Sequence, residues 1–130
     1  MADQANDSGP LDPRLSALEM CELVTTGRRS GEPRRIEIWF AADPDRPTIY
    51  FLSGGRDRAH WVRNLRANPA ALVRIGERSL QGLAREVEGD PDEDRARRLV
   101  AGKYGYWRPG EPFRGWARDS LPVAIDFEDG

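Results

Sequence analysis

A tight turn at residues 27–33 joins two short strand candidates and constrains the fold more than any other feature of this sequence. The segment 21–26 ends in two β-branched threonines, which favour strands. The segment 34–42 alternates: Arg35, Glu37 and Trp39 would face one side, with Ile36, Ile38 and Phe40 on the other. A connection this short joins antiparallel strands. The sequence therefore predicts a β-hairpin here.

The rest of the chain continues the same pattern of short strands and close turns. Further strands are expected at 48–53, 71–75, 80–87 and 121–127. Helices are expected at 57–67, with Asp57 as N-cap, and at 90–101, and a helical turn at 15–20. The segment 102–116, which mixes Gly, Pro and large aromatics, is expected to be a loop. Six strands joined mostly by hairpins indicate a mainly β fold, an antiparallel barrel with two or three helices at its side.

The totals limit the classes of protein that this chain can be. At 130 residues it is expected to form one domain, 14–130, after a polar, disordered tail at 1–13. A net charge of −2 makes no general case for nucleic acid or membrane binding. No apolar run is long enough to span a membrane, and no signal peptide is recognisable, so we expect a cytoplasmic protein.

Four arginines surround the glycines of the first turn. Arginine presents a planar, permanently charged fork that suits phosphate or carboxylate, and glycine lets backbone N–H groups approach an anion. The turn is therefore a candidate grip for a phosphorylated small molecule. The alternative is a solvated turn whose arginines only keep the surface soluble. The residues concerned are Arg28, Arg29, Arg34 and Arg35.

Two other clusters suggest what the rest of such a ligand would be. Ser53-Gly54-Gly55 ends a strand just before a helix and is followed by Arg56 and Arg58, an arrangement that favours an anion. The late loop is rich in aromatics that either cover a flat ring or plug the barrel: Tyr104, Tyr106, Trp107, Phe113 and Trp116. Charge at one end of a cleft and aromatic surface at the other match a flavin-like cofactor, whose ring performs the redox chemistry itself.

Other kinds of catalysis find little support in the sequence. One histidine, His60, and one cysteine, Cys21, cannot supply an ordinary zinc site, so no metal is expected. Cys21 lies inside a strand candidate and is expected to be a buried thiol. The serines lack the sequence context of an activated nucleophile.

At these residues the chain resembles the deazaflavin-dependent nitroreductase family, within the split-barrel flavin-binding superfamily that includes pyridoxamine phosphate oxidases. The resemblance covers about 23–125 and rests on 25–31 with Pro33-Arg34, on 53–55 and on the run 61–69. Tyr104 and the segment 116–123 are also similar. The resemblance implies a six-stranded antiparallel split β-barrel of Greek-key type. It also implies an oxidoreductase that passes hydride from reduced coenzyme F-420, a deazaflavin, to a nitroaromatic, quinone or enone.

The resemblance also assigns roles to individual residues. The phosphate and carboxylates of the cofactor tail would be held by Arg28, Arg29, Ser30, Gly31, Pro33 and Arg34. The deazaflavin ring would lie against Trp39, Ser53, Gly54 and Gly55, with Trp61 and Asn64 contributing from the following helix. Tyr104 would shape the acceptor pocket and could donate a proton to the reduced acceptor.

Departures from the family pattern leave alternatives open. Some relatives carry a lysine before the glycine pair, where this chain has Ser53, so Arg56 or Arg58 would supply the charge instead. The same superfamily also binds FMN, so an FMN-dependent oxidase or reductase is one alternative. A noncatalytic cofactor-binding protein is another. The resemblance also suggests a homodimer, because many split barrels bury one face against a second copy.

Overall fold

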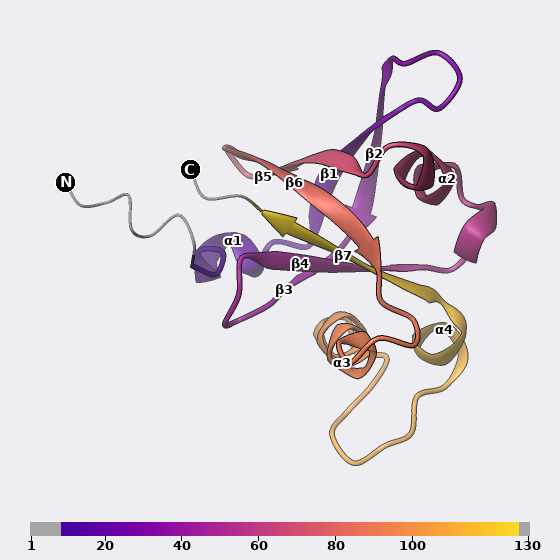
Figure 1. Cartoon of the computed structure of the whole chain (residues 1–130). Coiled ribbons are helices and arrows are strands. Elements are labelled where there is room, and N and C mark those ends of the chain that lie inside the picture. Colours follow the sequence, from indigo (N-terminus) through magenta and orange to yellow (C-terminus); the bar gives the residue numbers. More distant parts are fainter. Residues whose placement is uncertain (1–8, 128–130) are drawn as a thin grey trace.

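The computed structural model describes residues 9–127, which form a curled antiparallel sheet with helices around it (Figure 1). The sheet order is β2-β1-β5-β6-β7-β4-β3. The strands are β1 (Met20–Thr26), β2 (Pro33–Trp39), β3 (Ala41–Ala42), β4 (Thr48–Ser53), β5 (Ala70–Ile75), β6 (Arg78–Glu86) and β7 (Leu121–Phe127). The helices are α1 (Pro13–Ser16), α2 (His60–Ala67), α3 (Glu93–Lys103) and α4 (Gly115–Asp119), with a 3-10 turn η2 (Arg56–Arg58). The mainly β, antiparallel prediction is confirmed.

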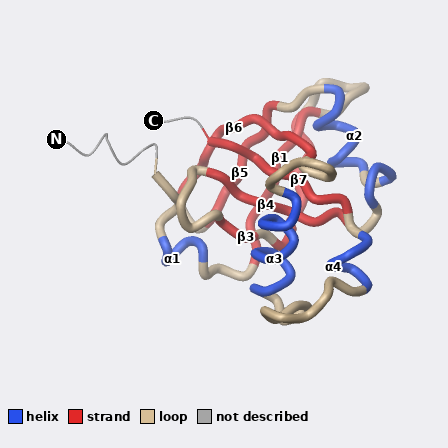
Figure 2. Tube along the Cα trace, turned by 60° about the horizontal axis from the view of Figure 1, so that its bottom comes forward, coloured by secondary structure: helices blue, strands red, loops and turns tan. Residues whose placement is uncertain are grey.

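Two apolar cores lie on opposite faces of β4, whose six residues are all buried. On the concave face, Ile49 and Phe51 pack with residues of β1, β5, β7 and α2. On the other face, Tyr50 and Leu52 pack against α3. Figure 2 shows α3 lying across the strands, with α1 and α2 at opposite ends of the sheet. The sheet therefore holds α2 and α3 at separate positions around β4.

Phe40 divides the strand predicted at 34–42, which is why the sheet has seven strands rather than six. Its backbone bonds to side chains at the end of α3 instead of to a neighbouring strand. Its N–H donates to the Tyr104 hydroxyl at 3.0 Å, and its carbonyl accepts from Lys103 Nζ at 3.0 Å. The chain consequently leaves β1 at Trp39 and pairs with β4 from Ala41. This break positions Trp39 at the end of β2.

The helix boundaries differ from the predicted ones. The expected turn at 15–20 is replaced by α1, which begins at Pro13 because the Asp12 side chain accepts a hydrogen bond from the Arg14 N–H. The predicted cap at Asp57 is wrong: this residue belongs to η2, and α2 starts after Ala59 without a side-chain cap. The segment 102–116, expected to be a loop, contains the end of α3 and the first two residues of α4. The part of the expected tail at 1–8 lies outside the described residues.

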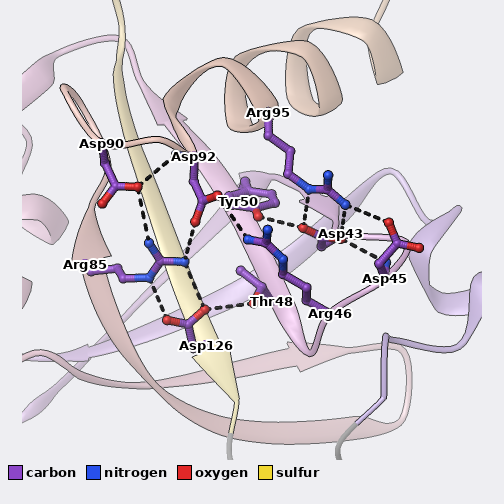
Figure 3. Close-up of polar contacts among 10 residues, drawn as sticks. All are labelled: Asp43, Asp45, Arg46, Thr48, Tyr50, Arg85, Asp90, Asp92, Arg95 and Asp126. Carbon is purple, nitrogen blue, oxygen red and sulfur yellow. Dashed lines mark hydrogen bonds and ion pairs between the residues drawn. The ribbon is translucent and has the colours of Figure 1, made fainter.

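A network of arginines and aspartates fixes the first turns of α3 on the sheet (Figure 3). Arg95 of α3 binds both carboxylate oxygens of Asp43, at 2.6 and 2.7 Å, in the connection between β3 and β4. Arg85 of β6 binds Asp126 of β7 at 2.7 Å and Asp92, just before α3, at 3.1 Å. The network therefore ties β4, β6 and β7 to α3.

Lys103 holds the opposite end of α3 through two backbone carbonyls. Its Nζ donates to the carbonyl oxygens of Leu18, at 2.6 Å, and Phe40, and lies 3.7 Å from the centre of the Phe40 ring. Burial lowers the pKa of this amine to about 8, because the charged form loses hydration. In the unfolded chain its pKa is about 10.4. Between these two values the unfolded chain binds more protons than the folded protein does.

It follows that the Lys103 contribution to the free energy of unfolding should rise with pH above about 8. We expect the wild-type protein to gain stability relative to a Lys103→Met variant between pH 7.5 and pH 9, in urea titrations at several pH values. Ionisation of Cys21 in the unfolded chain acts in the opposite direction on total stability, but both proteins contain this thiol, so its effect cancels from the difference between them. Burial raises the pKa of that thiol to about 12 in the folded protein. A difference that stayed constant or fell with pH would contradict this prediction.

Candidate cofactor-binding site

The β1–β2 hairpin carries the predicted anion-binding turn. The strands pair from Met20 with Trp39 to Thr26 with Pro33, so the turn lies immediately beyond the last pair. Within it the Gly27 N–H donates to the Glu32 carbonyl at 2.7 Å, and Gly31 takes a positive φ of 75°, which glycine adopts without strain. The Ser30 hydroxyl accepts from the Glu32 N–H at 3.1 Å and from Arg34 Nη2 at 3.3 Å. The turn is thus held by its own hydrogen bonds.

The four arginines of this hairpin differ from most others in the protein. Ten arginines elsewhere in the described chain form ion pairs with carboxylates. Within residues 9–127, none of the four in the hairpin does, although the chain has 22 acidic residues. Arg29, Arg34 and Arg35 are exposed, and Arg28 is half-buried. The hairpin therefore presents positive charge that no carboxylate of the described chain neutralises.

Arg28 is directed toward α2 by two residues one turn apart on that helix. Its Nη1 donates to Asn64 Oδ1 at 2.9 Å, and its Nη2 lies 3.3 Å from His60 Nδ1. Because a guanidinium can only donate, Nδ1 accepts in this contact and Nε2 carries the ring proton. Figure 1 shows the hairpin projecting beyond the sheet beside α2.

Four aromatic side chains gather at the other end of β2. Trp39 stacks on Tyr104, with ring centres 4.1 Å apart and planes 6° from parallel. Trp116 of α4 meets Trp39 edge-on at 5.8 Å, and Tyr106 lies within 6.0 Å of Trp39 and 5.4 Å of Trp116. Tyr106 is 56% exposed, so this cluster opens to solvent. It offers the flat apolar surface that a conjugated ring can stack on.

The segment 53–60 links the aromatic cluster to the arginine hairpin. A Cβ placed on Gly54 would lie 3.4 Å from Trp116, so this glycine packs directly against the aromatic cluster. Six residues later, His60 contacts Arg28. Ser53 is buried and donates to the carbonyl of Arg56 at 2.9 Å, which fixes the start of the segment. One stretch of backbone therefore connects aromatic surface to positive charge.

Tyr104 is placed where its ring can serve the site but its hydroxyl is occupied. The hydroxyl oxygen lies 2.6 Å from the carbonyl of Glu19 and accepts from the Phe40 N–H. Burial raises the pKa of this phenol. With its proton directed to a backbone carbonyl, Tyr104 is poorly suited to the predicted proton donation. Its geometry fits a support for Trp39 instead.

Two other predicted site residues, Arg56 and Trp61, lie in arrangements that favour structural roles. Arg56 donates to the carbonyl of Asp119 at 2.8 Å and pairs with Glu88, so its charge is already compensated. Trp61 packs edge-on against Phe51, with ring centres 6.0 Å apart, and joins the main core. Arg58 is exposed on η2.

Three residues near the site have contacts that the sequence indicates weakly or not at all. His60 is the one histidine of the sequence, and its four-residue spacing from Asn64, which places both on one helix face, is the signal for its contact with Arg28. Thr25 accepts from Asn64 Nδ2 at 3.1 Å, a contact that no sequence pattern signals. Trp116 was grouped with the loop aromatics, and its contact with Gly54 depends on the fold.

Comparison with known proteins decides the family. The model of the F-420H(2)-dependent quinone reductase family matches residues 2–125. The chain belongs to this family. The resemblance to deazaflavin-dependent reductases inferred from the sequence is thus confirmed.

Individual relatives agree with this placement. An F-420H(2)-dependent quinone reductase of Mycobacterium tuberculosis is 34% identical over 80 residues, which cover 60% of this chain and 54% of that protein. The chain thus spans about half the length of the curated relatives it matches.

Solved structures confirm the split-barrel fold. A protein described as an F-420 reductase superposes with a TM-score of 0.63 at 20% identity, covering 88% of this chain and 91% of its own. A Listeria innocua protein assigned to the pyridoxamine 5'-phosphate oxidases superposes with a TM-score of 0.63 at 20% identity, covering 88% and 87%. Within the described residues, no helix has the length and apolar character needed to cross a membrane.

Proposed function

We propose that this protein binds reduced coenzyme F-420 and transfers hydride from it to a small conjugated acceptor, a quinone in the first place. The family model and the curated quinone reductases support both the cofactor and the acceptor. The observation that carries the proposal is the segment 53–60, which joins a basic hairpin, without carboxylate partners among residues 9–127, to an aromatic cluster that opens to solvent. When bound, the deazaflavin supplies the hydride chemistry itself.

The basic hairpin fits the negatively charged tail of the cofactor. Arg28 and Arg29 would bind the phosphate, with Arg34 and the Ser30 turn beside them, through charge-assisted hydrogen bonds. The Arg28 guanidinium is already partly oriented for this role, because Asn64 and His60 contact it. Arg56 is not part of the proposal because Glu88 compensates its charge.

The aromatic cluster and the glycines fit the ring and the acceptor. Gly54 and Gly55 have no side chains, so the backbone can approach a flat ring closely. Trp39 and Trp116 would pack against ring or acceptor, and Tyr104 holds Trp39 in place. Holding the two reactants in van der Waals contact and away from water is the chief contribution that these residues make. No side chain is assigned as a proton donor.

Parallel binding and turnover measurements test the function. We expect F-420 to bind the apo-protein more tightly than FMN in fluorescence titrations, and reduced F-420 to be oxidised steadily when a benzoquinone is added. Tighter binding of FMN would point instead to an FMN-dependent enzyme of the same fold. Tight binding of F-420 without quinone turnover would point to a noncatalytic cofactor-binding protein.

A homodimer and a cytoplasmic location are further proposals. A groove of about 930 Å³ runs along the outer face of β1, β5 and β6 and includes Val24, Leu72 and Leu83. Leu83 is 52% exposed there. Apolar side chains gathered on one sheet face support burial against a second copy.

A further inference from the structure

Asn64 is a buried polar residue at the border of the apolar face of α2. It is 3% exposed, and its buried neighbours on α2 are Val62 and Leu65. A buried amide must find hydrogen-bond partners within the protein, since it has lost those of water. The partners of Asn64 therefore indicate what it does.

All its hydrogen bonds to other elements go to the β1–β2 hairpin. Oδ1 accepts from Arg28 Nη1 at 2.9 Å and from the Arg28 backbone N–H at 3.2 Å, which uses both of its lone pairs. Nδ2 donates to Thr25 Oγ1 at 3.1 Å, and Thr25 is itself buried. Asn64 thus binds both the backbone and the side chain of Arg28.

We propose that Asn64 is a positioning residue that fixes the Arg28 guanidinium for the phosphate of the cofactor, rather than a ligand of the cofactor itself. The proposal rests on the proposed function. A free arginine side chain loses rotamer freedom when it binds an anion, and a side chain already held in place loses less. Contacts with Asn64 and His60 take two of the five guanidinium N–H groups, which leaves three for an anion.

A double-mutant cycle separates positioning from direct contact. Asn64→Leu keeps the approximate size of the side chain and removes all three of its side-chain hydrogen bonds. We expect it to weaken F-420 binding about tenfold in the wild-type background and less than about twofold in an Arg28→Ala background, by fluorescence titration. Thr25→Val should give a smaller loss with the same dependence on Arg28. An Asn64→Leu effect of equal size in both backgrounds would show a direct ligand contact and overturn the proposal.

Val62→Ala is the matched control for a general loss of stability. Val62 is buried on the same helix and does not contact Arg28 through a hydrogen bond. We expect its F-420 affinity to stay within about twofold of wild type even though the protein is less stable. A loss equal to that of Asn64→Leu would mean that any loosening of α2 weakens binding, and would overturn the proposal.

A readout without cofactor tests the geometry itself. In the apo-protein, the Arg28 backbone N–H should exchange with solvent at least about tenfold faster in Asn64→Leu than in wild type. The exchange is measured by NMR under conditions chosen so that both proteins have the same free energy of unfolding. An unchanged exchange rate would overturn the positioning role of Asn64 even if F-420 bound normally. If the wild-type protein failed to bind F-420 while Asn64→Leu still raised the exchange rate of the Arg28 backbone N–H, the proposed function would be wrong. The positioning of Arg28 by Asn64 would then still hold.

Discussion

Replacing Asp43 by alanine is expected to lower the free energy of unfolding by about 3–5 kcal/mol, because it removes a fully buried carboxylate and breaks its ion pair with the partly exposed Arg95. Asp43 is fully buried and accepts from Arg95, from the Tyr50 hydroxyl at 2.7 Å and from the Asp45 N–H at 2.8 Å. Without its carboxylate, the Tyr50 hydroxyl loses its acceptor, and the Arg95 guanidinium keeps only the exposed carboxylate of Asp45. Total stabilities of small domains are about 5–15 kcal/mol, so this loss would be a large share.

Urea unfolding measures this loss, and an exposed ion pair on the same helix provides the control. Asp94 pairs with Arg98 one turn away and is 65% exposed, so Asp94→Ala should cost less than about 1 kcal/mol. A loss below about 1 kcal/mol for Asp43→Ala as well would show that the pair contributes little.

The Asp43 carboxylate should also make the free energy of unfolding depend on pH. Burial alone would raise the pKa of Asp43, but hydrogen bonds from Arg95, Tyr50 and the Asp45 N–H outweigh burial and lower it to about 2. The folded pKa thus lies below the unfolded value of about 3.9, so this stabilisation is nearly complete above about pH 5 and is lost progressively as pH falls through about 2. An Asp43→Asn variant should lack this part of the acid transition.

The strands were predictable because they depend on neighbours in sequence. Strand β4 was predicted with the observed bounds, since Thr48–Ser53 lies between a Pro-rich turn and a glycine pair. The break at Phe40 was not predictable. Its cause is a hydrogen bond from Phe40 to Tyr104, which lies 64 residues away in the chain. Local patterns indicate strands and turns, whereas a contact between distant segments decides where a strand stops.

Some features of the candidate site could likewise be predicted from the sequence, and others could not. The basic turn and the aromatic residues could be found by composition and spacing. The ion-pair partner of each arginine could not be predicted from the sequence. These partners distinguish Arg56, which pairs with Glu88, from Arg29, which pairs with no carboxylate in the described chain. The occupied hydroxyl of Tyr104 is likewise a property of the folded chain, because Glu19 reaches it only through the sheet.

Joint replacement of Arg28 and Arg29 by alanine is expected to weaken F-420 binding by at least about 100-fold. Hydrogen bonds to charged groups contribute about 1.5–3 kcal/mol each, so losing two amounts to about 3–6 kcal/mol, and 1.4 kcal/mol corresponds to tenfold in affinity. Arg28→Ala also removes one of the two donors to Asn64 Oδ1 and keeps the other, the backbone N–H of residue 28, so we expect a stability loss of about 0.5–1.5 kcal/mol in a protein that still folds.

The control must remove the same charge at a distance from the hairpin. Arg98 and Arg118 pair with acidic residues on their own helices, so Arg98→Ala with Arg118→Ala lowers the net charge equally. This control should bind F-420 within about threefold of wild type, because only long-range attraction changes and salt screens it. If both double variants lost affinity equally, overall charge would be the cause. If neither did, the hairpin arginines would be surface residues and the cofactor tail would bind elsewhere, since a guanidinium that grips a phosphate cannot be removed without a measurable cost.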